Sequence, residues 1–480
     1  MNQEKQTAVN AVEEKKEVIC RAADQIWEYA ELSLQEEKSA AYYCRVLREE
    51  GFLVEEGICN IPTAFAASFG TGSPRIGILA EYDALSGLSQ KAGCTEPREH
   101  IPGGCGHGCG HNLLGAGAMA AAIGIKAYLE KSKKPGTVIL YGCPGEEGGA
   151  AKAFMARDGL WKSLDAALTW HPEDVNEVNT GSSNSCIQTQ YKFSGVASHA
   201  AGAPEKGRSA LDAVELMNIG VQFLREHTSD KARIHYAITD TGGVSPNVVQ
   251  PKASVLYMVR SNHVAEAVKL QERVDRIAQG AALMTDTKVE KKFIDGLADT
   301  VPNSVLEQVL YENFKELGVP SYTQEELEFA DALAGTYAGS DGVPGVAAEY
   351  DTAAKEEVQA MQKKAGHAMN AFLAPLYKGE AFTPGSTDVG DVSWLTPTAQ
   401  IHVAAWPNGC PGHSWQNVSS GGTSIGHKAA VQAGKVLAAA GVELFEKPEL
   451  LAAAREEFEK RTASGYVCPI PADAVPVVPD

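Results

Sequence analysis

One stretch organises this chain, Gly106-His107-Gly108-Cys109-Gly110-His111-Asn112, because it places a thiol and an imidazole two residues apart in a loop broken by glycines. Glycine accepts the left-handed backbone angles of tight loops, and a loop with few side chains lets a bound ion come close to the backbone. Thiolates and imidazoles are common ligands of zinc and related metals. We therefore predict that this stretch supplies half of a metal site and that other segments supply the remaining ligands.

The composition and charge narrow the class of protein. The chain has 480 residues, which is enough for about two or three domains. Its formal net charge of −19 and the lack of a clustered basic segment disfavour nucleic acid and anionic membranes as partners. No apolar run reaches about 18 residues, and the N-terminus lacks the basic-then-apolar layout of a signal peptide. We expect a cytoplasmic protein that binds neither nucleic acid nor membrane.

The ten cysteines are too dilute for a disulfide scaffold, so most are expected to be buried free thiols. Cys105 and Cys109 could instead form one half of a structural zinc site. No second pair of cysteines at matching spacing is evident, which makes this alternative the weaker one.

Strands and helices alternate around the opening stretch. Apolar positions at helical spacing predict two helices within residues 6–50 and a long helix over 112–131. Apolar runs predict strands over 75–80, 137–141 and 166–170. This alternation is typical of a mostly parallel sheet covered by helices on both faces, so we expect an α/β fold.

Ligand-type side chains lie at the ends of these predicted strands. Open α/β sheets bind their ligands at the carboxyl ends of the strands. Together with the opening stretch, the residues placed there are Asp83, Cys109, His111, Glu146, Glu147 and His171. Thiolate, imidazole and carboxylate donors can hold two divalent ions and leave an open position for water. Each motif alone is weak, but their convergence on one sheet edge predicts a metal cluster.

The pattern changes after about residue 183. Strands over 188–194, 233–239, 254–260 and 288–293 and helices over 209–226 and 267–284 follow in the order βαββαβ. This is the ferredoxin-like order, completed within one continuous segment. We therefore predict a catalytic domain of residues 1–184 and 300–480 that is interrupted by an inserted domain of residues 185–299.

The first domain is predicted to resume after the insertion. Runs at 393–395 and 400–404, separated by Thr396-Pro397, are predicted as returning strands. Residues 323–365 are rich in Glu, Ala and Gly and are expected to form an irregular or helical excursion. The last twelve residues contain four prolines and are expected to form an extended tail.

Four motifs carry a resemblance to a known family: Gly-His-Gly-Cys-Gly-His-Asn, Cys-Pro-Gly-Glu-Glu-Gly-Gly, Thr-Trp-His-Pro and Pro-Gly-His-Ser-Trp. In this combination the chain resembles the metallopeptidase family M20, in its amidohydrolase branch. The resemblance extends over essentially the whole chain, including Glu-Tyr-Asp-Ala-Leu-Ser-Gly and Ser-Thr-Asp-Val-Gly-Asp-Val-Ser-Trp. It implies a zinc-peptidase-like sheet domain with an inserted ferredoxin-like domain that acts as a lid or in dimerisation.

The resemblance also implies roles for single residues. Two divalent ions, Mn or Zn, would be held by Cys109, His111, Glu147, His171 and His413, with Cys109 as the bridge. Glu146 would be the general base that takes a proton from the activated water, and Asp83 would orient a ligand imidazole. Glu81 stands where the family usually has a further ligand histidine. His107 has no counterpart among the family's ligands and is interpreted as a loop residue.

Three residues of the inserted domain resemble substrate-contacting positions. His199 is similar to a histidine that reaches into the partner subunit's active site and stabilises the oxyanion of the tetrahedral intermediate. Asn247 and Arg260 are similar to residues that hold a substrate carboxylate. From the residues alone, His199 could equally be a strand-end histidine facing solvent, and Arg260 an ordinary surface arginine.

The function implied by the resemblance is hydrolysis of an amide bond in a small N-acylated amino acid, with p-aminobenzoyl-glutamate or a related folate fragment first among substrates. The alternatives are a dipeptidase or aminoacylase for another substrate, or a subunit that is inactive without its partner. The expected assembly is a homodimer or a heterodimer with a related A subunit. A cysteine hydrolase using Cys109 with His111 is disfavoured, because positions two apart rarely place a nucleophile beside its base.

Overall fold

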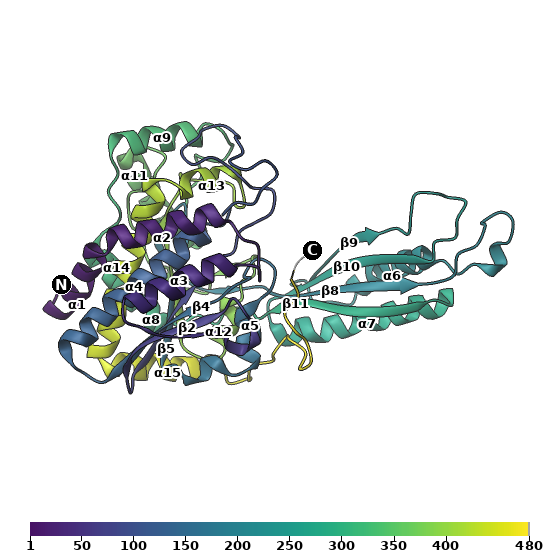
Figure 1. Ribbon diagram of the computed structural model, residues 1–480, viewed down its shortest axis with the longest axis horizontal. Coiled ribbons are helices and arrows are strands. Elements are labelled where there is room, and N and C mark those ends of the chain that lie inside the picture. Colours follow the sequence, from purple (N-terminus) through teal and green to yellow (C-terminus); the bar gives the residue numbers. More distant parts are fainter. Residues whose placement is uncertain (479–480) are drawn as a thin grey trace.

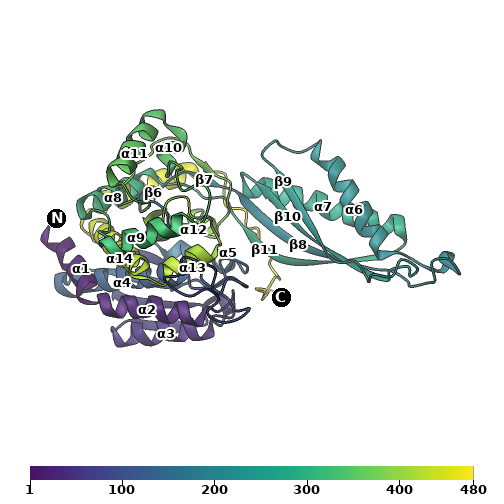
Figure 2. The same ribbon diagram turned by 90° about the horizontal axis from the view of Figure 1, so that it is seen from above.

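The computed structural model describes residues 1–478. Figure 1 shows a large body of strands and helices, from which a narrower arm extends to one side, and Figure 2 shows the same division from above. The arm consists of residues 185–297, and the segments before and after it build the body together.

The body contains a seven-stranded sheet in the order β1-β2-β4-β3-β5-β13-β6. Its strands are β1 (Leu53–Glu56), β2 (Phe65–Thr71), β3 (Arg75–Ala80), β4 (Gly136–Gly142), β5 (Ala166–Glu173), β6 (Glu177–Asn179) and β13 (Thr398–Ala404). The central strands β4, β3, β5 and β13 run parallel, whereas β1, β2 and β6 pair antiparallel at the two edges. The predicted α/β class with a mostly parallel sheet is confirmed.

Helices cover the sheet, and the first fifty residues form three of them: α1 (Gln3–Glu14), α2 (Lys16–Tyr29) and α3 (Glu37–Glu49). The prediction of two helices was wrong. Lys15 separates α1 from α2 with a non-helical backbone, at a φ of −96° and a ψ of 9°. This residue is neither glycine nor proline. The apolar residues keep their helical spacing across Lys15, since both helices bury an apolar face. The spacing therefore does not reveal that one helix ends and another begins there.

The long helix α4 (His111–Ser132) lies in the core beside α14 (Ser424–Glu446). Within the described residues, α4 is the one helix long and apolar enough to cross a membrane, and 89% of its most apolar window is buried in the protein. A helix that is apolar all round is expected where protein surrounds it.

Gly434 tests how closely these two helices pack, and Gly280, in the helix Val264–Thr285 of the arm, serves as its control. A Cβ atom at Gly434 of α14 would lie 2.5 Å from the Cβ atom of Ala120 in α4, whereas one at Gly280 would meet nothing within 4 Å. Gly434→Ala is therefore expected to destabilise the protein by about 1–3 kcal/mol through overpacking. Gly280→Ala should stabilise it by about 0.5–1 kcal/mol, because alanine favours a helix over glycine. Urea unfolding of both variants checks the prediction, and equal shifts would contradict it.

The arm has the predicted βαββαβ order. Its elements are β8 (Ser185–Ser194), α6 (Ala210–Arg225), β9 (Arg233–Asp240), β10 (Lys252–Ser261), α7 (Val264–Thr285) and β11 (Lys288–Leu297). The four strands form an antiparallel sheet in the order β11-β8-β10-β9, and the two helices pack on it around a separate apolar core. The exact domain boundaries at residues 184 and 299 stay a prediction.

The remaining elements complete the body. They are α5 (Ala151–Arg157), α8 (Ser304–Leu317), α9 (Gln324–Ala334), α10 (Val346–Tyr350), α11 (Thr352–Ala365), α12 (Val389–Ser393), α13 (Trp415–Gly421) and α15 (Pro448–Arg461), the short strands β7 (Ser182–Ser183) and β12 (Phe382–Thr383), and the 3₁₀ turns η1 (Ile58–Asn60) and η2 (Leu160–Ser163); a third such turn, η3 (Pro204–Lys206), belongs to the arm. The excursion over residues 323–365 is thus largely helical.

The C-terminal half has one of the two strands predicted for it. The strand over 400–404 is confirmed as part of β13, but residues 393–395 are the end of α12 and the turn after it. A short apolar run does not distinguish a strand from the buried end of a short helix. The tail predicted for residues 469–480 has no helix or strand up to residue 478, and its Ile470 is buried against the body. Residues 479 and 480 lie outside the described part.

Candidate metal centre

The parallel strands bring the predicted ligands to one edge of the sheet. Asp83 follows β3, Glu146 and Glu147 follow β4, and His171 lies near the end of β5. His111 is the first residue of α4 and is fully buried. Because β4, β3 and β5 are neighbours with the same direction, their carboxyl ends lie side by side.

Two groups of metal-ligand atoms share the thiol of Cys109. The ligand atoms of Cys109, His111 and His171 all lie within 4.8 Å of one another, and so do those of Cys109, Glu147 and His413. The Cys109 Sγ atom is 3.3 Å from His171 Nε2, and His413 Nε2 is 3.4 Å from Glu147 Oε1. One thiol between two ligand groups is the arrangement that a bridging ligand requires.

The imidazoles around Cys109 favour its thiolate form. Burial alone would raise the pKa of the Cys109 thiol, but the charges of His171 and His111 outweigh burial and hold this pKa well below its ordinary value. The thiolate is the form that binds metals. Burial raises the pKa of the neighbouring Glu147 to about 8, and the charge of Cys109 acts in the same direction.

Two buried atoms of the cluster make no hydrogen bond, His111 Nε2 and Glu147 Oε1, although they lie at ion-pair distance from Glu81 Oε2 (3.2 Å) and His413 Nε2 (3.4 Å). Buried polar atoms are normally paired, so each such atom needs an explanation. One atom belongs to each of the two ligand groups, and divalent ions at these groups would satisfy both. The residues present therefore fit two metal ions.

The loop before α13 presents His413 with an unusual backbone. This residue has a φ of 52°, in the left-handed region that residues other than glycine rarely adopt. Such strained positions are found where the surrounding structure holds a functional side chain in place. The strain is consistent with a role of His413 in the second ligand group.

Asp83 holds His111 in one orientation. Its Oδ1 atom is 2.8 Å from His111 Nδ1, while its Oδ2 atom accepts hydrogen bonds from Ser33 Oγ at 2.8 Å and from the Glu147 backbone N–H at 2.9 Å. His111 Nε2 is thereby turned towards the ligand group. Burial would raise the pKa of Asp83, but the charge of His111 outweighs it and lowers the pKa to about 2.

Asp83→Asn is expected to weaken metal binding by about 10–100-fold, because partners that orient a ligand imidazole typically contribute this much. Competition with a chelating dye measures the effect. Asp331→Asn is a matched control, since Asp331 pairs with His367 at 2.7 Å and belongs to neither ligand group. Equal metal affinities of the two variants would contradict the orienting role of Asp83.

Glu146 is placed beside the ligands without belonging to the two groups around Cys109. Its carboxylate lies within 4.8 Å of ligand atoms of Glu81 and His111, and it lines the same cavity as Glu147 and His413. Burial and the nearby charges of Glu81 and Glu147 raise the pKa of Glu146 well above its ordinary value. A carboxyl group with a raised pKa is suited to accepting a proton and passing it on.

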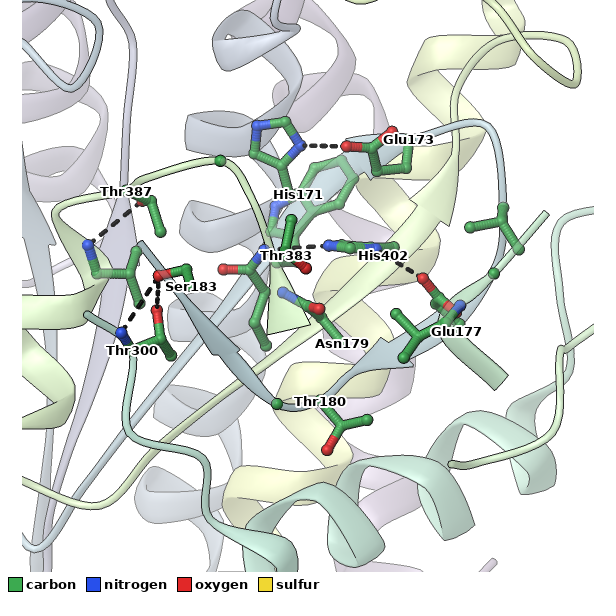
Figure 3. A pocket seen from close by; sticks show the side chains of 18 of the residues that line it. His171, Glu173, Glu177, Asn179, Thr180, Ser183, Thr300, Thr383, Thr387 and His402 are labelled. Carbon is green, nitrogen blue, oxygen red and sulfur yellow. Dashed lines mark hydrogen bonds and ion pairs between the residues drawn. The ribbon is translucent and has the colours of Figure 1, made fainter. Parts of the chain in front are cut away.

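A cavity of about 950 Å³ opens beside these residues. Cys109, Glu146, Glu147, His171 and His413 line it, and its other wall is rich in hydroxyl groups: Thr180, Ser182, Ser183, Thr300, Thr383, Ser386 and Thr387. Figure 3 shows several of these side chains together with His402 and Glu177. Its size suits a small molecule with polar ends.

His402 and Glu177 are cavity residues that the sequence interpretation missed. His402 Nδ1 is 3.1 Å from Glu177 Oε1, and His402 pairs in register with His171 on the neighbouring strand β5 (Figure 3). The available signal was the strand predicted over 400–404, which has a histidine at its middle position. The sequence does not give the order of the strands in the sheet, so it could not place this histidine beside His171.

The arm residues fall into two sets. Arg260 Nη1 donates a hydrogen bond of 2.8 Å to Ser386 Oγ, and Ser386 lines the cavity. His199 lies in the loop that follows β8 and Asn247 in the loop that follows β9. Figure 1 shows these loops at the end of the arm away from the body. Neither residue lines the cavity of its own chain.

The alternatives for the cysteines find little support. Among residues 1–478, no group of metal-ligand atoms includes Cys105. The Cys109 thiol interacts with both His171 and His413 as well as His111, which a simple thiol and base pair would not need. His107 is buried, and its Nε2 atom lies 2.9 Å from the Ile26 carbonyl oxygen, as expected of a structural loop residue.

The chain is similar to known proteins along most of its length. The family model described as peptidase family M20/M25/M40 matches residues 77–460. The B subunit of the p-aminobenzoyl-glutamate hydrolase of Escherichia coli (strain K12) is 45% identical over 471 residues, which cover 97% of each chain.

Two solved structures share the fold. The aminobenzoyl-glutamate utilization protein from Klebsiella pneumoniae has a TM-score of 0.58 at 16% identity and covers 89% of this chain and 96% of its own. The Bacillus subtilis YXEP protein, described as a dinuclear metal binding peptidase, has a TM-score of 0.52 at 17% identity and covers 90% of this chain and 99% of its own.

Proposed function

The chain belongs to the peptidase family M20/M25/M40, and on that premise we propose that it is an amidohydrolase with two divalent ions, Mn or Zn, that cleaves p-aminobenzoyl-glutamate or a related N-acylated amino acid. The ions would be held by Cys109, His111, Glu147, His171 and His413. The observation that carries the proposal is the pair of ligand groups that share Cys109, beside Glu146 and open to the cavity.

The chemistry follows from this placement. Bound divalent ions would polarise the amide carbonyl and lower the pKa of the attacking water. The Glu146 carboxylate accepts a proton from that water and passes it to the nitrogen of the departing amine. Asp83 keeps His111 in the tautomer and orientation in which Nε2 faces the ligand group.

The substrate carboxylates need a cationic partner, and Arg260 is the proposed one. Its hydrogen bond to Ser386 places the guanidinium next to the cavity wall. A guanidinium binds a carboxylate through two parallel hydrogen bonds. Arg260→Met is expected to raise KM for acyl-glutamates by about tenfold or more, because a hydrogen bond to a charged group is lost.

Steady-state kinetics of Arg260→Met and of Arg45→Met test this assignment. Arg45 is an exposed arginine paired with Glu49 on α3, so its substitution removes the same charge away from the cavity. Equal KM values for the two variants would contradict the role of Arg260.

A second chain is proposed to complete the site. His199 and Asn247 are exposed in the loops that follow β8 and β9, and neither lines the cavity of its own chain, which supports a role in the cavity of a partner. His199 would donate a hydrogen bond to the oxyanion there. The E. coli relative is named as the B subunit of its enzyme, which supports a heterodimer with a related A subunit over a homodimer.

The proposal is tested on the purified chain with Mn²⁺ or Zn²⁺ added. Glutamate release from p-aminobenzoyl-glutamate is expected, with loss of activity on chelation and recovery on adding the metal back. A panel of acyl-glutamates and dipeptides ranks the substrates. Activity only after adding the related A subunit would identify the chain as half of a heterodimer. Chelator-resistant activity blocked by thiol alkylation would overturn the proposal in favour of a cysteine hydrolase.

A further inference from the structure

Lys152 of α5 is a fully buried lysine that the proposed reaction does not use. Its ammonium lies 2.6 Å from Glu81 Oε1 and 2.5 Å from Asp388 Oδ1, and all three side chains are buried. The backbone N–H of Lys152 also donates to Asp388 Oδ2 at 2.9 Å. The ammonium thus joins the end of β3 to the segment before α12 in a place without solvent.

Glu81 is the partner that matters for the metal centre. While its Oε1 atom contacts Lys152, its Oε2 atom lies 3.2 Å from His111 Nε2. That nitrogen is the one without a hydrogen-bond partner, and Asp83 turns it towards the ligand group. One carboxylate oxygen of Glu81 therefore lies beside the imidazole nitrogen of His111, while Lys152 engages the other oxygen.

The geometry nevertheless keeps Glu81 apart from the thiol. The ligand atoms of Glu81, His111 and Glu146 form a group of their own within 4.8 Å, and this group shares only His111 with the group of Cys109, His111 and His171. An ion held by Cys109, His111 and His171 would share only the His111 imidazole with the group that contains Glu81. Its other two ligands lie outside that group. If Glu81 were released, its carboxylate could turn to that ion, since carboxylates bind Mn²⁺ and Zn²⁺ readily.

We propose that Lys152 is a positioning residue that holds the Glu81 carboxylate away from the metal ions and so keeps the open position beside Glu146 free for water and substrate. The ammonium engages one oxygen of Glu81 directly, and Asp388 holds the same ammonium in place. A catalytic ion needs such an open position, whereas a closed set of protein ligands is typical of structural sites. The inference rests on the proposed metal centre.

The test is a double variant that conserves charge, Lys152→Met/Asp388→Asn. It removes one positive and one negative group and leaves Glu81 without its partner. Binding of Mn²⁺ alone, measured by competition with a chelating dye, is expected to tighten by about tenfold or more as Glu81 joins the ion. Adding Glu81→Gln to the double variant is expected to return the affinity to the wild-type value. The control Lys428→Met/Glu326→Gln removes a partly buried ion pair between α14 and α9 and should leave the affinity unchanged.

Each outcome either supports or overturns the proposed role of Lys152. Unchanged affinity in the double variant, or tight binding that survives the addition of Glu81→Gln, overturns the role of Lys152. The single variant Glu81→Gln keeps the pair of Lys152 and Asp388, so it provides a second measurement if the double variant does not fold. Wild-type affinity in Glu81→Gln supports the inference, and a loss of affinity overturns it by showing that Glu81 is itself a ligand. Wild-type protein that binds no Mn²⁺ or Zn²⁺ would instead overturn the proposed function.

Discussion

Glu146→Gln is expected to lower turnover by about 10²–10⁴-fold, because the variant keeps the shape of the side chain but cannot take a proton from the attacking water. The metal content should stay at the wild-type value, since Glu146 belongs to neither of the groups that share Cys109. Steady-state kinetics and elemental analysis of the same preparation measure both quantities. The split between lost turnover and retained metal is the signature of a proton-transferring residue.

The matched control is Glu349→Gln, which removes an exposed carboxylate from the wall of the same cavity. This variant should change turnover far less than Glu146→Gln does. Normal turnover of Glu146→Gln would show that another group takes the proton. A parallel loss of metal would instead make Glu146 a ligand and leave the base to be found elsewhere.

Cys109→Ala is expected to empty both metal positions, because its thiol is the one atom common to the two ligand groups. Turnover should fall by about 10³-fold or more, since bound ions supply several kcal/mol of charge stabilisation in the transition state. Elemental analysis after gel filtration, followed by titration with Mn²⁺ or Zn²⁺, measures the loss at each position.

Cys105→Ala is the control, because Cys105 lies four residues earlier in the same loop and belongs to no ligand group among residues 1–478. It should retain its metal and its turnover. Loss of only one ion in Cys109→Ala would contradict the bridging role and assign the thiol to a single metal.

The candidate ligands could be predicted because local patterns placed them. The strand over 75–80 was predicted with the limits it has as β3, and the strands ending near Glu146 and His171 were predicted to within a few residues. In a parallel sheet the carboxyl ends of the strands lie at one edge. Predicting the strands therefore also predicts which side chains gather at that edge. His413 was the exception, because only the resemblance to family M20 linked it to the others.

Other features have no signal in local patterns. The break at Lys15 lacks glycine and proline, and residues 393–395 are too short to distinguish a strand from a helix end. The pairing of His402 with Glu177 depends on which strands are neighbours. In each case the decisive contact joins segments that the spacing of apolar residues does not relate.

The sequence by itself determined the α/β class, the βαββαβ arm, and the edge of the sheet at which thiol, imidazoles and carboxylates gather, because hydrophobic periodicity and the alternation of strands with helices can be recognised locally. Only the tertiary structure decided how those ligands divide into two groups around Cys109, and that His199 and Asn247 lie outside the cavity of their own chain. It also decided that Lys152 lies between Glu81 and Asp388. Distances between side chains far apart in the chain arise from packing, and no local pattern encodes them.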